Sequence, residues 1–267
     1  MHRSLTMNLS SLFGIGFAMI IFSSSIFLST DNYLFYFNFH AILIVIGGTA
    51  SAAFISFPAK KVFGLVKVFM SRLLGYNRRN YTQVIEEIVL LAKAREDGFN
   101  KFNEVIQNIE DPFLKEAAEV LEWGEAEIDE SLLRELLENR LETFYTRYMK
   151  EANIFKVISK FPPAFGLLGT TLGMIALLQS LGPGSQDSIG SSMAVALVAT
   201  MYGIAIANFV FIPIAENLAA QTEEDHVNRR IVVEGVMMIY KKLPVQFIEE
   251  NAKSFLLPKE RLESRAS

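Results

Sequence analysis

The sequence contains no cysteine, and its only histidines are His2, His40 and His226. Without cysteine, the chain can form no disulfide, no thiol nucleophile and no cysteine-ligated metal site. The histidines lie far apart along the chain, so they form no metal-ligand or nucleophile–base motif. We therefore predict that the chain is not an enzyme and carries no cofactor.

Charge is absent from the most apolar parts of the sequence. Hydrophobic residues make up 51% of the 267 positions, charged residues 20%, and the mean hydropathy is +0.29. Four windows have the roughly 20 apolar residues that span a bilayer, and none contains Asp, Glu, Lys or Arg: about 9–28, 34–57, 161–181 and 188–214. No β pattern is present, so the expected fold class is an all-α membrane protein with four transmembrane helices.

The distribution of basic residues predicts the orientation. The loops between spans one and two and between spans three and four contain Asp31 and Asp187 but no Lys or Arg. Because cytoplasmic segments carry an excess of basic residues, both termini and the segment 58–160 are expected in the cytoplasm. The residues that follow span two carry the clearest basic cluster: Lys60, Lys61, Lys67, Arg72, Arg78 and Arg79. The net charge of −4 gives no indication of nucleic-acid binding.

The spans divide the chain into four expected parts: spans one and two (1–57), a helical cytoplasmic domain (58–160), spans three and four (161–214) and a helical cytoplasmic end (215–267). Helices are predicted over about 80–95, 99–109 and 112–124, with Gly98 as a breaker and Asp111 as an N-cap. Asp129 or Ser131 begins a long helix that leads into span three. Pro213 is expected to bend the helix of span four, because proline removes a backbone donor.

Span three carries small residues at helical spacing. Gly166, Gly169 and Gly173 form one stripe, although each glycine costs about 1 kcal/mol in a helix interior relative to alanine. Span four has its own stripe: Ser192, Ala196, Ala199, Gly203 and Ala207. Small residues let membrane helices approach closely. The stripe in span three is thus either a packing seam alone or a seam that also lines a path for a small polar species.

Two threonines supply polar atoms within these spans. At a rise of about 1.5 Å per residue, Thr170 and Thr200 both fall near the middle of the membrane, and a shared groove between antiparallel neighbours is one interpretation. The other is that each hydroxyl bonds to its own helix backbone. Ion carriers usually place an ionisable residue at membrane depth. Either this chain moves no ions, or a partner helix supplies the acid and the stretch Phe161–Met174 is the wall that faces it. In the second case the small residues of the stripe are expected to face that partner span and let it slide past.

Several segments resemble the MotA/PomA family, the A-subunits of bacterial flagellar stators. The strongest similarities are residues 162–173 (PPAFGLLGTTLG) and 194–203 (AVALVATMYG), in register with the layout of spans. Shorter matches are 211–215 (FIPIA), 228–230 (NRR) and 234–236 (EGV), and the resemblance covers nearly the whole chain.

The resemblance implies a mechanism and partners. Five A-subunits surround two B-subunits, whose single spans carry an ion-accepting aspartate, and flow of H⁺ or Na⁺ across the inner membrane drives the rotor protein FliG. Thr170 and Thr200 match threonines near the ion path, while Pro163 and Pro213 match the prolines linked to coupling. Arg95 matches the arginine that meets the rotor.

Two departures from the family pattern affect these assignments. The family's rotor-facing glutamate falls on Asn103, with Glu104 adjacent. Sodium-driven members often have two successive threonines in span four, whereas this sequence has Ala199-Thr200, which favours protons. An energiser of the TolQ/ExbB type is the alternative, but those proteins typically have three spans in a different order. A structural scaffold without transport is a further alternative, which would be favoured if the A/B pair showed no ion flux in liposomes with the plug of the B-subunit removed.

Overall fold

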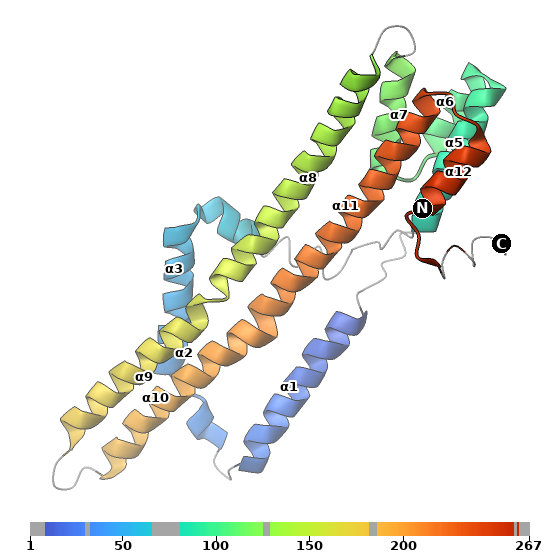
Figure 1. Ribbon diagram of the computed structural model, residues 1–267. Coiled ribbons are helices and arrows are strands. Elements are labelled where there is room, and N and C mark those ends of the chain that lie inside the picture. The colour runs from blue at the N-terminus through green and yellow to red at the C-terminus, as the bar shows by residue number, and fades with distance from the viewer. Residues whose placement is uncertain are drawn as a thin grey trace. The chain divides into compact units, whose positions relative to one another are not determined.

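The computed structural model describes residues 9–29, 33–65, 81–124, 129–181, 186–258 and 261, and every regular element among them is helical (Figure 1). This confirms the all-α class. The chain forms two compact units, unit 1 (1–77 and 149–219) and unit 2 (78–148 and 220–267). Two of the dividing points, at 148/149 and 219/220, fall inside the long helices Glu130–Ile158 and Ile212–Tyr240, so no loop marks these two points in the sequence. Asp31, Lys67, Arg72, Arg78 and Arg79 lie outside the described residues.

Three helical stretches are long and apolar enough to cross a membrane. They lie within Phe39–Ser56, Glu130–Ser180 and Ile189–Tyr240. These three ranges correspond to the second, third and fourth expected spans. The first expected span is helix α1 (Leu9–Ser29), in which the apolar stretch Gly16–Ser29 is shorter than the other three. Length and composition therefore identify three membrane-length helices among the described residues.

The second of these spans is a continuous helix with a local change of winding. It follows a 3₁₀ turn, η1 (Tyr33–Tyr36), and consists of α2 (Phe39–Ile42), the π-helical segment η2 (Leu43–Gly47) and α3 (Gly48–Ser56). Nothing in the sequence indicated this π-helical segment, since the residues Leu43–Gly47 contain no proline or side chain that interrupts the backbone ladder.

The remaining helices of unit 1 are α9 (Phe161–Ser180) and α10 (Gln186–Ile206), which run antiparallel and side by side (Figure 1). A second π-helical segment, η3 (Ala207–Phe211), follows α10, and α11 (Ile212–Tyr240) begins there. Pro213 has no N–H to donate to the carbonyl of Phe209 inside η3, and the N–H of Ile212 bonds instead to the carbonyl of Ala207. The structure therefore has a widened helical turn next to Pro213, the residue at which a bend was predicted.

Unit 2 contains the predicted cytoplasmic helices, with boundaries close to those expected. They are α5 (Tyr81–Asp97), α6 (Phe99–Asn108), α7 (Pro112–Gly124) and the start of α8 (Glu130–Ile158). Gly98 adopts φ +117°, a region that disfavours side chains, and so ends α5 sharply. Asp111 is the N-cap of α7, because its Oδ1 accepts hydrogen bonds from the backbone N–H groups of Phe113 and Leu114 at 2.9 and 2.8 Å.

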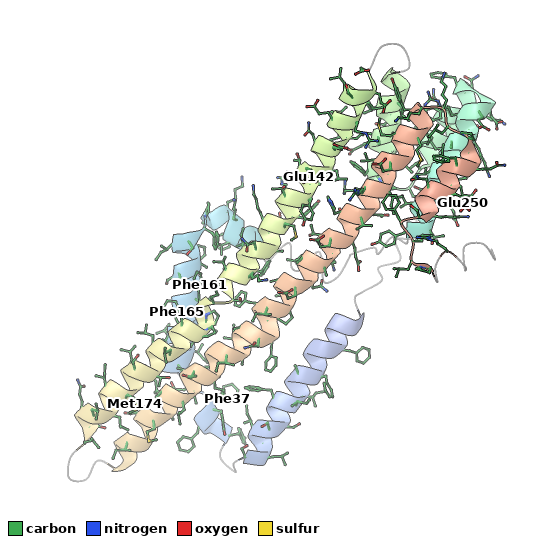
Figure 2. The ribbon with its side chains drawn as sticks, viewed as in Figure 1. Phe37, Glu142, Phe161, Phe165, Met174 and Glu250 are labelled. Atoms are coloured by element: carbon green, nitrogen blue, oxygen red, sulfur yellow. The ribbon has the colours of Figure 1, made fainter. Side chains whose placement is uncertain are left out.

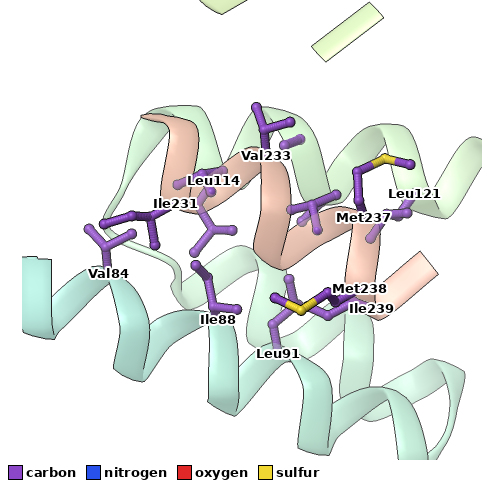
Figure 3. Close-up of a cluster of buried hydrophobic side chains, with 14 of the residues drawn as sticks. Val84, Ile88, Leu91, Leu114, Leu121, Ile231, Val233, Met237, Met238 and Ile239 are labelled. Carbon is purple, nitrogen blue, oxygen red and sulfur yellow. The ribbon is translucent and has the colours of Figure 1, made fainter. Parts of the chain in front are cut away.

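The core of unit 2 draws aliphatic side chains from α5, α6, α7, α8, α11 and α12 (Val245–Lys253) (Figure 3). Ion pairs at its rim join α8 to α11. Arg134 donates hydrogen bonds to both carboxylate oxygens of Glu234 at 3.1 and 3.4 Å, and these bonds raise the pKa of Arg134. The Tyr145 hydroxyl donates to Glu223 at 2.7 Å, which raises the pKa of Tyr145.

Helix α11 ends in a Schellman motif, a backbone arrangement that normally places glycine in the left-handed region. The N–H of Lys242 bonds to the carbonyl of Ile239 at 3.0 Å, and the N–H of Leu243 bonds to that of Met238 at 3.2 Å. Lys242 has φ +56° and is the only non-glycine residue with a positive φ among the described residues. For a residue with a Cβ atom this conformation costs about 1–2 kcal/mol.

Candidate functional site

The glycine stripe of α9 is buried against α10 of the same chain. A Cβ atom added to Gly169 would lie 2.5 Å from the Cβ of Ala199, and one added to Gly173 would lie 2.8 Å from the Cβ of Ala196. A Cβ at Gly166 would lie 2.9 Å from the carbonyl oxygen of Ala199. Because real Cβ contacts are rarely so short, all three positions require glycine at this helix separation.

The two threonines meet within this seam. The hydroxyl of Thr170 is hydrogen-bonded to the hydroxyl of Thr200, and both side chains are half-buried. Thr170 Oγ1 also lies 2.9 Å from the carbonyl oxygen of Ala196 and 3.2 Å from that of Gly166, while Thr200 Oγ1 lies 3.3 Å from the latter. The hydroxyls therefore bond across the seam, and Thr170 also lies within reach of its own helix four residues back. We call the hydroxyls of Thr170 and Thr200 the hydroxyl pair. With the carbonyl oxygens of Gly166 and Ala196 they form a cluster of four oxygens.

The chemistry of this cluster is limited to hydrogen bonding and to weak coordination of a hard cation. Hydroxyl and carbonyl oxygens are ligands that such cations accept. Neither α9 nor the part of α10 that faces it places an ionisable side chain here, so the cluster has no group that accepts a proton at neutral pH. Within the described residues, no three His, Cys, Asp or Glu side chains gather to hold a metal ion.

The position of the glycine stripe corrects one expectation. The stretch Phe161–Met174 was predicted to present its small residues to a partner span, but Gly166, Gly169 and Gly173 contact α10 instead. The prediction was wrong because spans three and four, joined by a short turn, use each other's small residues. The exposed faces of α9 and α10 carry many large apolar side chains: Leu167, Leu168, Leu172, Ile175, Leu178, Met193, Leu197 and Ile204.

The two candidate prolines occupy different surroundings. Pro163 lies at the start of α9, and its Cα would lie 3.1 Å from a Cβ atom added to Gly203, which would also overlap the carbonyl of Pro162. Because Gly203 has no side chain, the first turn of α9 can pack directly against α10. Pro213 is exposed on α11 next to η3 and does not join the hydroxyl pair.

The candidate rotor-contact residues lie in unit 2, on the successive helices α5 and α6. Arg95 is half-buried in the last turn of α5, with its guanidinium carbon 5.9 Å from the centre of the Phe102 ring. Glu104 is exposed on α6. The pKa of Lys101 is raised chiefly by its hydrogen bond to Asp97, and Glu104 adds a smaller electrostatic contribution. Asn103, which stands where the family has glutamate, is half-buried on the same helix.

Sequence reasoning missed two contacts of the spans. Phe165 of α9, labelled in Figure 2, packs so closely on Gly48 of α3 that a side chain there would overlap its ring. Gly47 and Gly48 in span two are small residues that let helices approach closely, but they do not indicate which helix makes the contact. Tyr202 of α10 donates a hydrogen bond to the carbonyl of Tyr36. No signal in the sequence pairs these two tyrosines, which are 166 positions apart.

The fold and the hydroxyl pair define a class: a helical membrane protein with several spans and two hydrogen-bonded hydroxyls in the seam between two of them. A family model described as the MotA/TolQ/ExbB proton channel family matches residues 105–230. The chain is 31% identical over 266 residues to "Motility protein A" of Borreliella burgdorferi, covering 98% of each. It is 28% identical to "Chemotaxis protein PomA" of Vibrio alginolyticus, covering 94% of this chain and 96% of that protein.

Solved structures agree with these relatives. A chain in the C. jejuni MotAB structure has a TM-score of 0.83 and 25% identity to this chain, covering 94% of this chain and 97% of its own. One in the flagellar MotAB stator complex of Bacillus subtilis has the same TM-score and coverage, with 27% identity. The chain belongs to the MotA/TolQ/ExbB proton channel family, a family of channel subunits.

Proposed function

We propose that the chain is the A-subunit of a bacterial flagellar stator, which couples inward ion flow to torque on the rotor. The observation that carries this proposal is the polar seam without an acid: the hydroxyl pair lies between two apolar helices that contain no proton acceptor beside it. A chain of this kind conducts ions only with a partner that brings a carboxylate into the membrane. The full-length relatives that carry motility names support the same conclusion.

The partner is a B-subunit whose single span carries the ion-accepting aspartate. The two MotAB structures support this pairing, since chains of the same fold occur there in MotAB complexes. We further propose a homopentamer of this chain around the B-subunit spans. The exposed aliphatic faces of α9 and α10 supply apolar surface for lipid, neighbouring copies and the B-subunit.

The proposed topology has four spans in the inner membrane, with both termini in the cytoplasm. Helix α1 supplies the first span, and the absence of Lys and Arg from the two short loops supports the orientation. Pro163 and Pro213 are proposed to transmit movement of the spans to the rest of the chain. The transported ion is H⁺ or Na⁺, and the single threonine at Ala199-Thr200 favours H⁺.

An energiser of the TolQ/ExbB type is the second candidate, because the matching family model covers that group as well. The relatives that match over nearly the whole length carry motility or chemotaxis names, which favours the stator. Complementation distinguishes the two. Expressed with its B-subunit in cells that lack a stator, the chain restores swimming if it is a stator subunit.

The rotor contact is assigned to Arg95, with Glu104 nearby on the exposed face of α6, and FliG is the proposed rotor protein. We expect Arg95→Glu to reduce torque at least severalfold, because reversing a contact charge replaces attraction by repulsion. Lys93→Glu is the matched control, since Lys93 is exposed on the same helix and undergoes the same change of charge. Torque is measured on tethered cells, with membrane assembly followed by blotting.

The result of the Arg95 experiment is interpretable only if the complex still assembles. If Arg95→Glu fails to insert or to form the A/B complex, Arg95 has a structural role instead. Equal torque in the Arg95 and Lys93 variants would remove Arg95 from the rotor contact.

A further inference from the structure

A small pocket opens on unit 2 beside Arg95. It has a volume of about 240 Å³ and is lined by α5, the end of α11, the turn after it and α12: Ala92, Arg95, Glu96, Ile239, Lys242, Leu243 and Ile248. Three of the lining side chains are buried and form an apolar floor: Ala92, Ile239 and Ile248. The charged side chains in the lining are Arg95, Glu96 and Lys242.

Lys242 is held at this pocket by an unusual backbone. It occupies the position of the Schellman motif where glycine is the common residue, with φ +56°. A strained residue of this kind points to a use for its side chain. Its ammonium group has no ion-pair partner among the described residues, whereas the neighbouring Lys241 pairs with Glu130 at 2.7 Å.

The size of the pocket limits what it can hold. Pockets that bind small molecules usually measure about 300–1,000 Å³, so a volume of about 240 Å³ suits one protruding side chain better than a nucleotide. The apolar floor fits an aliphatic side chain. The rim carries two cations, Arg95 and Lys242, against one carboxylate, Glu96, and so favours an acidic group beside that side chain.

We propose that this pocket is a docking site for a segment of the rotor protein in which an aliphatic side chain and an acidic side chain lie side by side. The aliphatic side chain enters the pocket, and the carboxylate lies against Lys242 and Arg95. The inference rests on the proposed function, and it adds Lys242 and α12 to a contact that resemblance assigns to Arg95 alone. In this arrangement the end of α11 and the end of α5 bind the same segment of the partner.

The absence of cysteine provides a direct test. Lys242→Cys introduces a single thiol into the whole chain, and a benzophenone maleimide attached there cross-links to whatever occupies the pocket. The full A/B complex in membranes is illuminated with purified FliG. We expect a cross-link from position 242 at least fivefold stronger than from Lys241→Cys, the adjacent paired lysine. Equal yields from both positions, or none from either, would overturn the docking site.

Three further variants separate binding from folding. Lys242→Gly removes the ammonium but suits the left-handed backbone, so the thermal midpoint of the complex should stay equal or rise by roughly 2–4 °C. Its affinity for FliG should nevertheless fall about three- to tenfold. Lys242→Arg should retain affinity, and Lys242→Glu should lose more than the glycine variant. Unchanged affinity in Lys242→Gly would contradict the proposal.

The outcomes also distinguish this inference from the proposed function. If Arg95→Glu abolishes FliG binding while all Lys242 variants bind normally, the rotor contact at Arg95 stands and the Lys242 side of the pocket is not part of it. If neither position affects binding while the complex still restores swimming, the chain is a stator subunit whose rotor contact lies elsewhere. Failure to restore swimming with intact assembly would remove the proposed function itself.

Discussion

Thr170 and Thr171 are adjacent and chemically identical, but their surroundings differ. Thr170 is half-buried and meets Thr200 across the seam. Thr171 is exposed and bonds only to its own helix, at 3.1 Å to the carbonyl of Leu167 and 2.8 Å to that of Leu168. Substituting Thr170 and Thr171 separately therefore distinguishes the effect of a hydroxyl in the seam from that of a hydroxyl on the helix surface.

We expect Thr170→Val to lower ion flux through the A/B complex about tenfold, since losing one hydrogen-bonding oxygen costs roughly 1 kcal/mol or somewhat more. Thr171→Val should leave flux unchanged. Flux is measured in proteoliposomes that contain the complex with its plug removed. Equal effects of the two substitutions would show that the hydroxyl pair has no role in the ion path.

Single residues were predictable where spacing alone determines position. A shared groove for Thr170 and Thr200 was one of two interpretations, and in the structure the two hydroxyls are hydrogen-bonded to each other. Thr170 also lies within reach of its own helix, as the other interpretation expected. The strained Lys242 was not predictable, because its left-handed backbone depends on where α11 ends, and no glycine marks that end in the sequence.

At the scale of helices, the α9–α10 seam depends on complementary small residues. A methyl group at Gly169 would lie 2.5 Å from the Cβ of Ala199, far closer than van der Waals contact. Gly190 of α10 is the matched control, since a Cβ there meets nothing within 4 Å. The same chemical change can therefore be made inside and outside the seam.

We expect Gly169→Ala to destabilise the complex by about 1–3 kcal/mol, the usual cost of overpacking. Gly190→Ala should be neutral or slightly stabilising, because alanine favours helix. Adding Ala199→Gly to Gly169→Ala should restore most of the loss, since it moves the methyl group from one helix to the other. Thermal unfolding of the detergent-solubilised complex measures all three, and absence of rescue would contradict direct packing of these residues.

The helices of unit 2 were predictable because caps and breakers are local signals. Asp111 caps α7 and Gly98 ends α5 as expected. The π-helical segment η2 was not predictable, since tertiary packing rather than composition selects it. The direction of the glycine stripe was misjudged for the same reason, because a stripe shows that a helix packs closely but not against which neighbour.

At the scale of the whole molecule, the ion is decided by measurement on cells. The single threonine at Ala199-Thr200 leads us to expect a proton-driven motor. Swimming speed should then stay constant as sodium is varied at fixed pH, and a protonophore should stop the cells. A speed that rises with sodium and resists the protonophore would show a sodium-driven motor instead.

The central claim is that this chain supplies the walls of an ion path and its partner supplies the acid. Proteoliposomes loaded with a pH- or sodium-sensitive dye test this claim most directly. We predict flux from the plug-free A/B complex, and none from the A-subunit alone or from a complex whose B-subunit aspartate is changed to asparagine. Flux through the A-subunit alone would contradict the account.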